Sequence, residues 1–249
     1  MKYLFFIGYM LIALTVHSQI RNVTVDTLSI DIKQGPKQFS KTLRPPLLLI
    51  GAGVYAMSDN DVLSRYEFKE ERDEYFPTFR HRADDYLQFA PIVAVYGLNA
   101  LDIKGKHDFR TRSMLLLKSE LIMTALTFSL KKITAVPRPD TGQPTSFPSG
   151  HTAQAFAAAT FMVKEYGDRS VLYSIGAYSL ASGIGVMRVM NNRHWISDVL
   201  AGAGIGILST NLAYFLHDHS RKGKGKRHAS LILPSYDGQA GSITLIKTL

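Results

Sequence analysis

The sequence contains no cysteine in its 249 residues. This absence excludes disulfide bridges, a thiolate nucleophile, cysteine-ligated zinc or iron–sulfur sites, and a lipid-modified N-terminal cysteine. Any catalytic site in this chain must therefore be built from other side chains.

Charged residues are also scarce, at 20% of the chain, whereas apolar residues reach 46%. This composition excludes a disordered or fibrous chain. The mean hydropathy of +0.01 is high for a soluble enzyme, so membrane association is an expectation from the outset. The chain has 29 Lys and Arg against 20 Asp and Glu, a net charge of +9. This excess of positive charge predicts an anionic partner or a location at a membrane.

A short apolar run opens the chain. Met1 and Lys2 precede the apolar residues 3–16, and His17-Ser18-Gln19 follows them. A charged start, a short hydrophobic centre and a small-residue exit are typical of a secretory signal peptide, so we expect residues 1–18 to be removed on export. The alternative is a membrane anchor that is never cleaved, although a spanning helix needs about 20 apolar residues.

Residues 19–85 predict an N-terminal arm followed by an amphipathic region. Residues 20–42 show no sustained periodicity, and we expect them to be mostly extended. Pro45-Pro46 then opens a short helix at 47–57, which is too short to span a membrane and would lie at a surface or pack. Residues 58–85 hold nine acids and five bases with aromatics between them. We interpret that stretch as solvated.

Residues 86–217 predict an all-α core. Helical stretches are expected at 86–101, 113–130, 152–165, 171–187 and 199–216. With 47–57 these give a bundle of about six helices, which we expect to be embedded in a membrane. Lys118 and Glu120 would lie in the middle of a helix and would have to face the bundle interior or each other. The alternative is a tightly packed soluble all-α protein.

Small residues are concentrated in the last two of these helices, where they would allow close helix packing and a possible homo-oligomer. Residues 218–249 form a basic tail, in which 231–249 alternate apolar and polar residues around Asp237-Gly238 and predict a short C-terminal β-hairpin. The basic residues have no aromatic interleaving. We therefore expect this tail to meet an anionic membrane surface and no nucleic acid.

The basic residues also predict an orientation. The loop 102–112 and the tail 217–228 carry clusters of Lys and Arg and would be cytoplasmic by the positive-inside rule. Alternating the helices from there places 131–151 and 188–198 together on the outer face. This orientation fails if 47–57 also crosses the membrane after an exported N-terminus, because one more crossing reverses everything downstream.

Three clusters in these outer loops have the residue types of a phosphate site. Ser149 is a plausible N-cap of the helix that follows, and free N–H groups at a helix start favour an anion. His194 and Asp198 are four residues apart and share a helix face, so that the carboxylate can hold one imidazole nitrogen. The clusters are Lys131 with Arg138-Pro139, then Pro148-Ser149-Gly150-His151, then Arg188 with His194 and Asp198.

This set of side chains supplies what phosphoryl transfer needs without a metal. Lys131, Arg138 and Arg188 would neutralise the phosphoryl oxygens in the transition state. Neutral His194, oriented by Asp198, would attack in line. His151 would donate a proton to the leaving alcohol and would then activate the water that hydrolyses the phosphohistidine.

The motifs Lys131-x6-Arg138-Pro139, Pro148-Ser149-Gly150-His151 and Arg188-x5-His194-x3-Asp198 resemble the three-part signature of the type 2 phosphatidic acid phosphatase and vanadium haloperoxidase superfamily. The resemblance covers residues 131–198. It implies that Ser149 and Gly150 bind phosphate together with Lys131, Arg138 and Arg188, and that neither a divalent metal nor another cofactor is needed. The family usually has Ser before the third-motif Arg, where this chain has Met187, which puts one hydrogen bond to phosphate in doubt.

We therefore expect a metal-independent phosphatase that hydrolyses a phosphomonoester or diphosphate, most simply of a lipid, through a phosphohistidine. Its expected location is the inner membrane, with the active site facing the periplasm. Candidate substrates are phosphatidic acid, phosphatidylglycerol phosphate, an isoprenoid diphosphate or a phosphate on lipid A. Alternatives are a soluble periplasmic acid phosphatase of the same superfamily, a vanadate-dependent haloperoxidase, and a non-catalytic membrane protein.

Overall fold

The chain folds into helices followed by one pair of strands. A computed structural model describes residues 36–58, 60, 62–224, 230–236 and 241–247. They divide into two compact units, one up to Ala213 and one from Tyr214 onward. The signal peptide predicted at 1–18 and the arm predicted at 20–35 lie outside the described residues.

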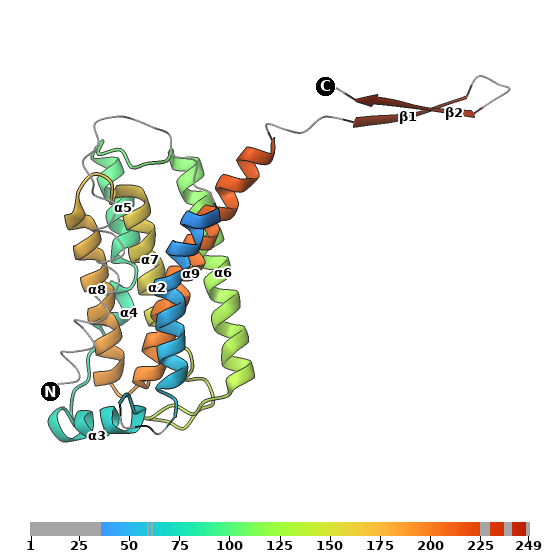
Figure 1. Cartoon of the computed structure of the whole chain (residues 1–249). Coiled ribbons are helices and arrows are strands. Elements are labelled where there is room, and N and C mark those ends of the chain that lie inside the picture. Colours follow the sequence, from blue (N-terminus) through green and yellow to red (C-terminus); the bar gives the residue numbers. More distant parts are fainter. Residues whose placement is uncertain (1–35, 59, 61, 225–229, 237–240, 248–249) are drawn as a thin grey trace. The chain divides into compact units, whose positions relative to one another are not determined.

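Eight helices are present in the described part of the chain (Figure 1). They confirm the all-α expectation for the core. Six correspond to the expected helices. The other two are α3, which lies in the stretch 58–85 interpreted above as solvated, and α4, which begins in that stretch and ends at Leu87. The helices are α2 (Pro36–Tyr55), α3 (Arg65–Tyr75), α4 (Ala83–Leu87), α5 (Ala90–Ala100), α6 (Phe109–Thr134), α7 (Gly150–Tyr166), α8 (Val171–Met190) and α9 (Ile196–Lys224).

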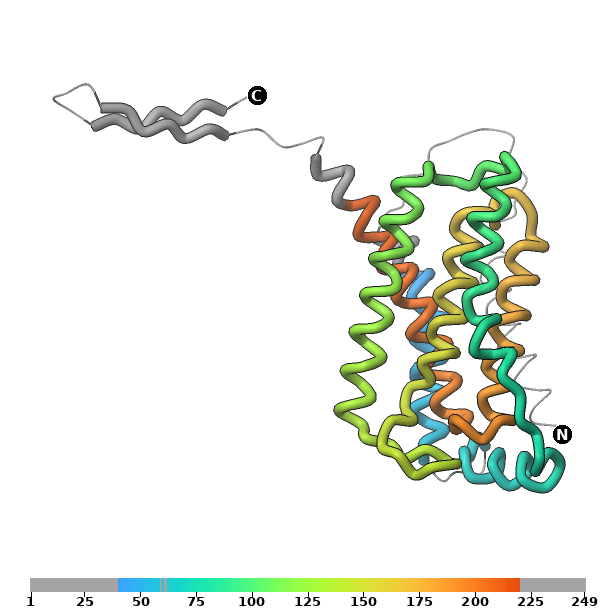
Figure 2. Tube along the Cα trace, turned by 180° about the vertical axis from the view of Figure 1, so that it is seen from behind, coloured from blue at the N-terminus to red at the C-terminus, as the bar shows by residue number. Residues whose placement is uncertain are grey.

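Helix α7 is the centre of the first unit. Of its 17 residues, 14 are buried, and it packs against α5, α6 and α8, as Figures 1 and 2 show from opposite sides. A helix that is buried all round forms the core of its bundle. Because α7 begins with Gly150 and His151, the second motif is attached to this buried helix.

Helix α9 touches α7 with almost no side chain between them. A Cβ on Gly202 would lie 2.6 Å from the carbonyl oxygen of Ser149, and one on Gly206 would overlap the carbonyl oxygen of Ala153. Glycine at these positions lets the two backbones meet. The expected close packing is thus present for α9, whereas a Cβ on Gly176 or Gly183 of α8 would meet no atom within 4 Å. A homo-oligomer stays a prediction.

Helix α2 is longer than predicted. It begins at Pro36 and runs through Pro45 and Pro46 to Tyr55, so the expectation of an extended arm up to residue 42 and a helix only from 47 was wrong. A proline inside a helix costs about 3 kcal/mol, a cost that packing against α9 offsets. Glycines on both helices allow this contact: a Cβ on Gly53 would lie 2.7 Å from the Ser197 carbonyl oxygen.

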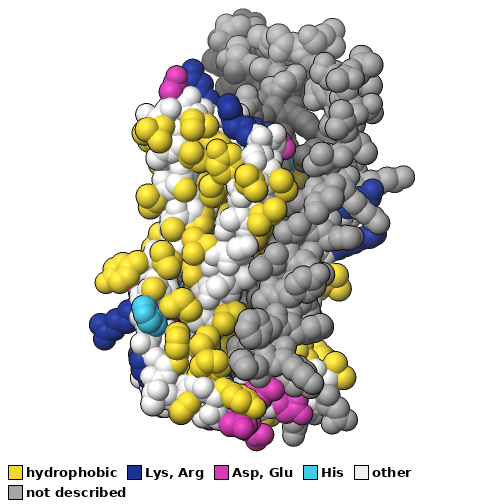
Figure 3. Space-filling view, turned by 90° about the vertical axis from the view of Figure 1, so that its left-hand side faces the viewer, with side chains coloured by type: hydrophobic (Ala, Val, Ile, Leu, Met, Phe, Trp, Pro, Cys, Tyr) yellow, Lys and Arg dark blue, Asp and Glu magenta, His cyan; other side chains and the backbone are white. Residues whose placement is uncertain are grey.

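Two helices of the described chain are long and apolar enough to cross a membrane, Phe109–Thr134 and Ile196–His219. Helix α6 also exposes a row of large apolar side chains along one face, while Glu120 turns toward α7 and accepts a hydrogen bond from Gln154 Nε2 at 2.8 Å. Figure 3 shows another long side of the bundle, where hydrophobic side chains cover most of its height. The side chains of this row are Met114, Leu117, Leu121 and Phe128.

The second unit contains an antiparallel strand pair. Strand β1 (Ser230–Tyr236) pairs with β2 (Gly241–Lys247), with Ser230 opposite Lys247 and Tyr236 opposite Gly241. The Asp237-Gly238 turn that the sequence analysis places here lies outside the described residues.

The contact between α9 and α7 predicts a stability difference between two glycine substitutions. Gly206→Ala places a methyl group against the backbone of α7 and should lower the unfolding free energy by about 1–3 kcal/mol through overpacking. Gly183→Ala is the matched control, because a Cβ there meets nothing within 4 Å. Thermal unfolding of the purified variants measures the difference, and equal melting temperatures would contradict the backbone contact.

Candidate active site

The three sequence motifs meet at one end of the first unit. The C-terminal ends of α6 and α8 and the N-terminal ends of α7 and α9 lie together, at the lower end in Figure 1. Local backbone and capping features mark where these helices end and begin. Ala135 adopts the left-handed conformation, with φ of 47°, at the end of α6, and the Ser149 side chain caps α7 by accepting a hydrogen bond from the Thr152 N–H.

His194 and Asp198 form a buried imidazole–carboxylate pair. His194 Nδ1 lies 3.2 Å from Asp198 Oδ2, and the two side chains are 2% and 0% exposed. The same carboxylate oxygen accepts hydrogen bonds from the Ser146 hydroxyl at 2.5 Å and from the Trp195 N–H at 2.9 Å. Because Nδ1 faces the carboxylate, Nε2 is the nitrogen left for nucleophilic attack.

The surroundings of His194 keep its imidazole neutral. Burial lowers its pKa to about 4, the positive charges of Arg188 and Arg138 act in the same direction, and the hydrogen bond and charge of Asp198 oppose them. Desolvation disfavours the charged form of a histidine. The ring therefore carries a free electron pair at neutral pH, as a nucleophile requires.

Ser149 and Gly150 shape the start of α7. The Ser149 N–H donates to the carbonyl oxygen of Asp198 at 2.9 Å, which ties the second motif directly to the third. A Cβ on Gly150 would meet only Thr127 Cγ2, at 4.0 Å, so packing inside the protein does not require glycine there. Without a side chain, the first turn of α7 stays open to an anion, which its N–H groups and dipole favour.

Lys131 and Arg138 frame the loop between α6 and α7. Lys131 Nζ donates to the carbonyl oxygens of Thr145 and Ser146, at 2.5 and 3.2 Å, and Arg138 Nε donates to the Thr145 hydroxyl at 3.2 Å. Burial and the charge of Arg188 hold the pKa of Arg138 below its ordinary value. Arginine nevertheless remains charged in proteins, so the end of α6 and the loop after it each bring a basic side chain to the site.

Arg188 and His151 have carboxylate partners that the sequence analysis missed. Arg188 Nη1 lies 2.7 Å from Asp84 Oδ2, and His151 Nε2 lies 2.9 Å from Asp85 Oδ1. Both acids belong to α4, in the stretch that was interpreted as solvated. One signal could have indicated these two acids. They directly precede the predicted helix 86–101, and the expected topology places the start of that helix at the same end of the bundle as the motifs.

Comparison with known protein families matches residues 112–222 to the model described as the PAP2 superfamily. These residues belong to the PAP2 superfamily. The match includes all three motifs, whereas α2, α3, α4 and α5 lie outside it.

Similar proteins include the lipid A 1-phosphatase of Porphyromonas gingivalis, which is 35% identical over 185 residues. The alignment covers 73% of this chain and 40% of that protein, so the chain spans less than half of its relative's length.

Two crystal structures are also similar. A transmembrane PAP2-type phosphatidylglycerolphosphate phosphatase from Bacillus subtilis aligns with a TM-score of 0.51 and 22% identity, over 76% of this chain and 99% of that one. LpxE from Aquifex aeolicus aligns with a TM-score of 0.48 and 23% identity, over 64% and 99%. At 22% identity, the similarity to the Bacillus subtilis structure supports the fold alone.

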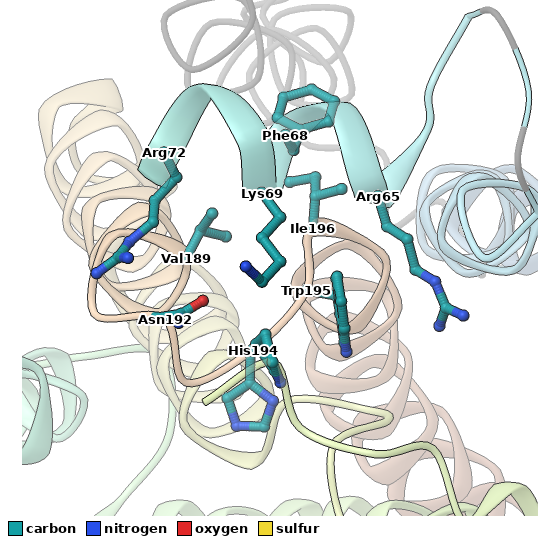
Figure 4. A pocket seen from close by; sticks show the side chains of 10 residues that line it. Arg65, Phe68, Lys69, Arg72, Val189, Asn192, His194, Trp195 and Ile196 are labelled. Carbon is teal, nitrogen blue, oxygen red and sulfur yellow. The ribbon is translucent and has the colours of Figure 1, made fainter. Parts of the chain in front are cut away.

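Helix α3 covers the site end of the PAP2 domain (Figure 4). Between α3 and the loop that follows α8 lies a pocket of about 10 Å³, room for about one water molecule. Lys69 extends from α3 toward the loop residues Asn192 and His194, beside Trp195 (Figure 4). The pocket thus borders the imidazole–carboxylate pair from the α3 side.

Two contacts hold α3 in this place. Arg72 Nε donates to the carbonyl oxygen of Met190, at the end of α8, at 3.0 Å. The Tyr66 ring meets the Trp195 ring edge-on, with centroids 5.7 Å apart, a favoured geometry for aromatic pairs. Because Trp195 follows His194, α3 is anchored next to the site.

All eight predicted site residues lie at this end of the PAP2 domain, where hydrogen bonds link them in part. The Lys131 ammonium bonds the Ser146 carbonyl, and the Ser146 hydroxyl bonds Asp198. Ser146 is fully buried and was not among the predicted residues, since a single serine in a loop carries no sequence signal. The chemical roles of the eight remain predictions.

The buried His194 predicts an unusual titration. Its ring signals in an NMR titration, identified by their loss in His194→Gln, should stay constant from pH 8 down to about 5 and move only near pH 4. The unfolded chain takes up this proton near pH 6.5. The unfolding free energy should therefore fall as the pH drops from 6.5 toward 4. Titration of the native ring near 6.5 would contradict the burial.

Proposed function

We propose that the protein is a phosphatase that hydrolyses a phosphate ester of a lipid. The observation that carries this proposal is the buried His194–Asp198 pair, which lies with three cations and a second histidine at the end of an apolar helical bundle. A nucleophile, a proton donor and cations for the phosphoryl oxygens are the groups that metal-free phosphoryl transfer requires.

In the proposed reaction, Nε2 of His194 attacks phosphorus in line with the leaving oxygen. As the N–P bond forms, the P–O bond to the lipid breaks, and His151 transfers its proton to that oxygen. Lys131, Arg138 and Arg188 neutralise the charge on the phosphoryl oxygens. Water, which gives a proton to His151, then attacks the phosphohistidine, releasing phosphate and restoring His194.

The first substrate we propose is lipid A carrying a phosphate, because the Porphyromonas gingivalis relative has lipid A 1-phosphatase as its name. The other lipid phosphates named from the sequence, namely phosphatidic acid, phosphatidylglycerol phosphate and an isoprenoid diphosphate, form the comparison set. All share a phosphate joined to an apolar body. The exposed apolar row of α6 would keep that body beside the site.

We further propose that the bundle lies in the inner membrane with the site facing the periplasm. The loop with Lys104 and Lys106 joins α5 to α6 at the end opposite the motifs, which favours a cytoplasmic position for that loop. Helix α2 constrains the N-terminus. Gly53 of α2 packs beside the start of α9 and Gly204 packs beside Pro46, so α2 runs toward the site end over 20 residues, about 30 Å.

The direction of α2 creates a conflict between a cleaved signal peptide and a site that faces the periplasm. If α2 crosses the membrane and the site is periplasmic, residue 36 lies on the cytoplasmic side. A signal cleaved after residue 18 would instead leave the following residues outside. A cleaved signal and a periplasmic site are compatible only if α2 does not cross the membrane. If α2 does cross, we propose that the site still faces the periplasm and that the signal is not cleaved, because the basic residues support this orientation independently.

Hydrolysis assays test the activity. The purified wild type should release orthophosphate from phosphorylated lipid A faster than from the comparison lipids or from p-nitrophenyl phosphate. His194→Asn should lower kcat by at least about 10³-fold, and Asp198→Asn by about 10²–10⁴-fold, as when other catalytic imidazole–carboxylate pairs are broken. Radiolabelled phosphate should be trapped as an acid-labile adduct in the wild type and be absent in His194→Asn.

The control for these assays is His219→Asn, which removes an exposed histidine of the second unit and should retain activity. A wild type silent on every phosphate ester would contradict the proposed function. Hydrolysis of soluble esters alone would favour the secreted acid phosphatase instead.

Cysteine accessibility tests the orientation, because the chain contains no cysteine of its own. Thr141→Cys lies in the exposed loop at the site end and Lys104→Cys in the exposed loop at the other end. In intact cells a membrane-impermeant maleimide should label Thr141→Cys alone, and Lys104→Cys only after permeabilisation. The reverse pattern would place the site in the cytoplasm, and labelling of both in intact cells would indicate a soluble periplasmic protein. Ser29→Cys reports the side reached by the residues after the apolar run.

A further inference from the structure

Helix α4 introduces two carboxylates into a site whose motifs contain only one. Asp84 and Asp85 lie outside residues 112–222, the part of the chain matched to the PAP2 superfamily. Helix α4 packs against both α7 and α8, the two helices that carry His151 and Arg188. The two acids therefore reach the site from a separate segment, and each faces a different group.

Asp84 binds Arg188 through one terminal nitrogen of the guanidinium, Nη1. The distance from Arg188 Nη1 to Asp84 Oδ2 is 2.7 Å, and the two side chains are 8% and 1% exposed. The Nε–H of Arg188 is buried and has no hydrogen-bond partner. A guanidinium fixed through Nη1 still presents its Nε side, the geometry that binds two phosphate oxygens side by side.

Asp85 faces His151. Its Oδ1 lies 2.9 Å from His151 Nε2 and 3.8 Å from Arg188 Nη1, and its side chain is 46% exposed. The His151–Asp85 pair therefore repeats, on the other side of the site, the arrangement of His194 and Asp198. The difference is exposure: the nucleophile pair is buried and its imidazole neutral, whereas the His151 side chain is 32% exposed.

The charges around His151 explain why a second carboxylate is needed. Burial lowers the pKa of His151, and the positive charge of Arg188 on α8 acts in the same direction, whereas the hydrogen bond and charge of Asp85 and the charge of Asp84 on α4 oppose this shift. Of these three groups, only Asp85 forms a hydrogen bond with the His151 ring. A general acid must hold its proton when the substrate binds, and a carboxylate partner stabilises the protonated imidazole.

We propose that Asp85 is the positioning residue of the general acid, and that its carboxylate keeps His151 protonated and oriented beside Arg188. This inference rests on the proposed phosphatase function. With Nε2–H donating to Asp85, the Nδ1–H gives its proton to the leaving oxygen as the P–O bond breaks. His151 then recovers a proton from the attacking water, and Asp85 stays ionised throughout.

The pH dependence of kcat tests this role. In the wild type, activity should fall at alkaline pH as His151 loses its proton. In Asp85→Asn that alkaline limb should move about one unit toward lower pH, a tenfold loss of kcat on the alkaline side, whereas the acid limb set by His194 should not move. Asp85→Glu should restore most of the wild-type profile. Asp168→Asn, which removes an 88% exposed carboxylate paired with Lys106, is the charge-matched control.

Each other outcome overturns the proposal in a recognisable way. A lower KM with an unmoved alkaline limb would mean that Asp85 blocks the site in place of phosphate. A lower melting temperature with an unmoved limb would mean a purely structural role. The position of the limb does not depend on the amount of folded enzyme, so partial unfolding of Asp85→Asn cannot imitate the shift. A wild type without phosphatase activity refutes the proposed function itself, whereas an active wild type with an unmoved limb in Asp85→Asn refutes only the role of Asp85.

Discussion

The direct backbone contact between α7 and α9 is the constraint on which the candidate site depends. Gly202 and Gly206 remove the side chains that would separate the two helices, and the Ser149 N–H reaches the carbonyl oxygen of Asp198 at 2.9 Å. The start of α7, where an anion would bind, is thereby held against the start of α9, where the His194–Asp198 pair lies. Close helix approach of this kind requires glycine, because any Cβ would meet backbone atoms that cannot move aside.

Electrostatics divide the site into two halves of opposite character. His194 is buried and kept neutral by desolvation and by the charges of Arg188 and Arg138, while His151 is more exposed and faces the acidic helix α4. Burial and Arg188 lower the pKa of both rings, but at His151 the two carboxylates of α4 oppose this shift. Different surroundings of two like groups allow one site to supply both a nucleophile and an acid. In the proposed reaction Arg188 serves both halves, since it lowers the pKa of His194 and holds phosphate beside His151.

Most of the helical core could be predicted from the sequence, because helices such as α7 and α8 are long, largely apolar stretches that are bounded by polar loops. Helix α2 could not, because its two prolines read locally as a helix start, and only contact with α9 offsets their cost. Asp84 and Asp85 were not predicted for a related reason: in a stretch with nine acids and five bases, no local pattern separates the two acids that pair with Arg188 and His151 from the other acids. Ser146 is a lone loop serine whose partner Asp198 lies 52 residues away.

The sequence by itself determined the chemistry available to this protein: no thiols, two histidines and three cations in three spaced motifs, and helices apolar enough to suit a membrane. These features follow from residue type and local spacing. The spacing of four residues also predicted the His194–Asp198 pair, but only the tertiary structure decided the partners of Arg188 and His151. The burial that keeps His194 neutral and the carboxylates of α4 that face Arg188 and His151 depend on contacts between segments more than 60 residues apart, and spacing along the chain carries no information about such contacts.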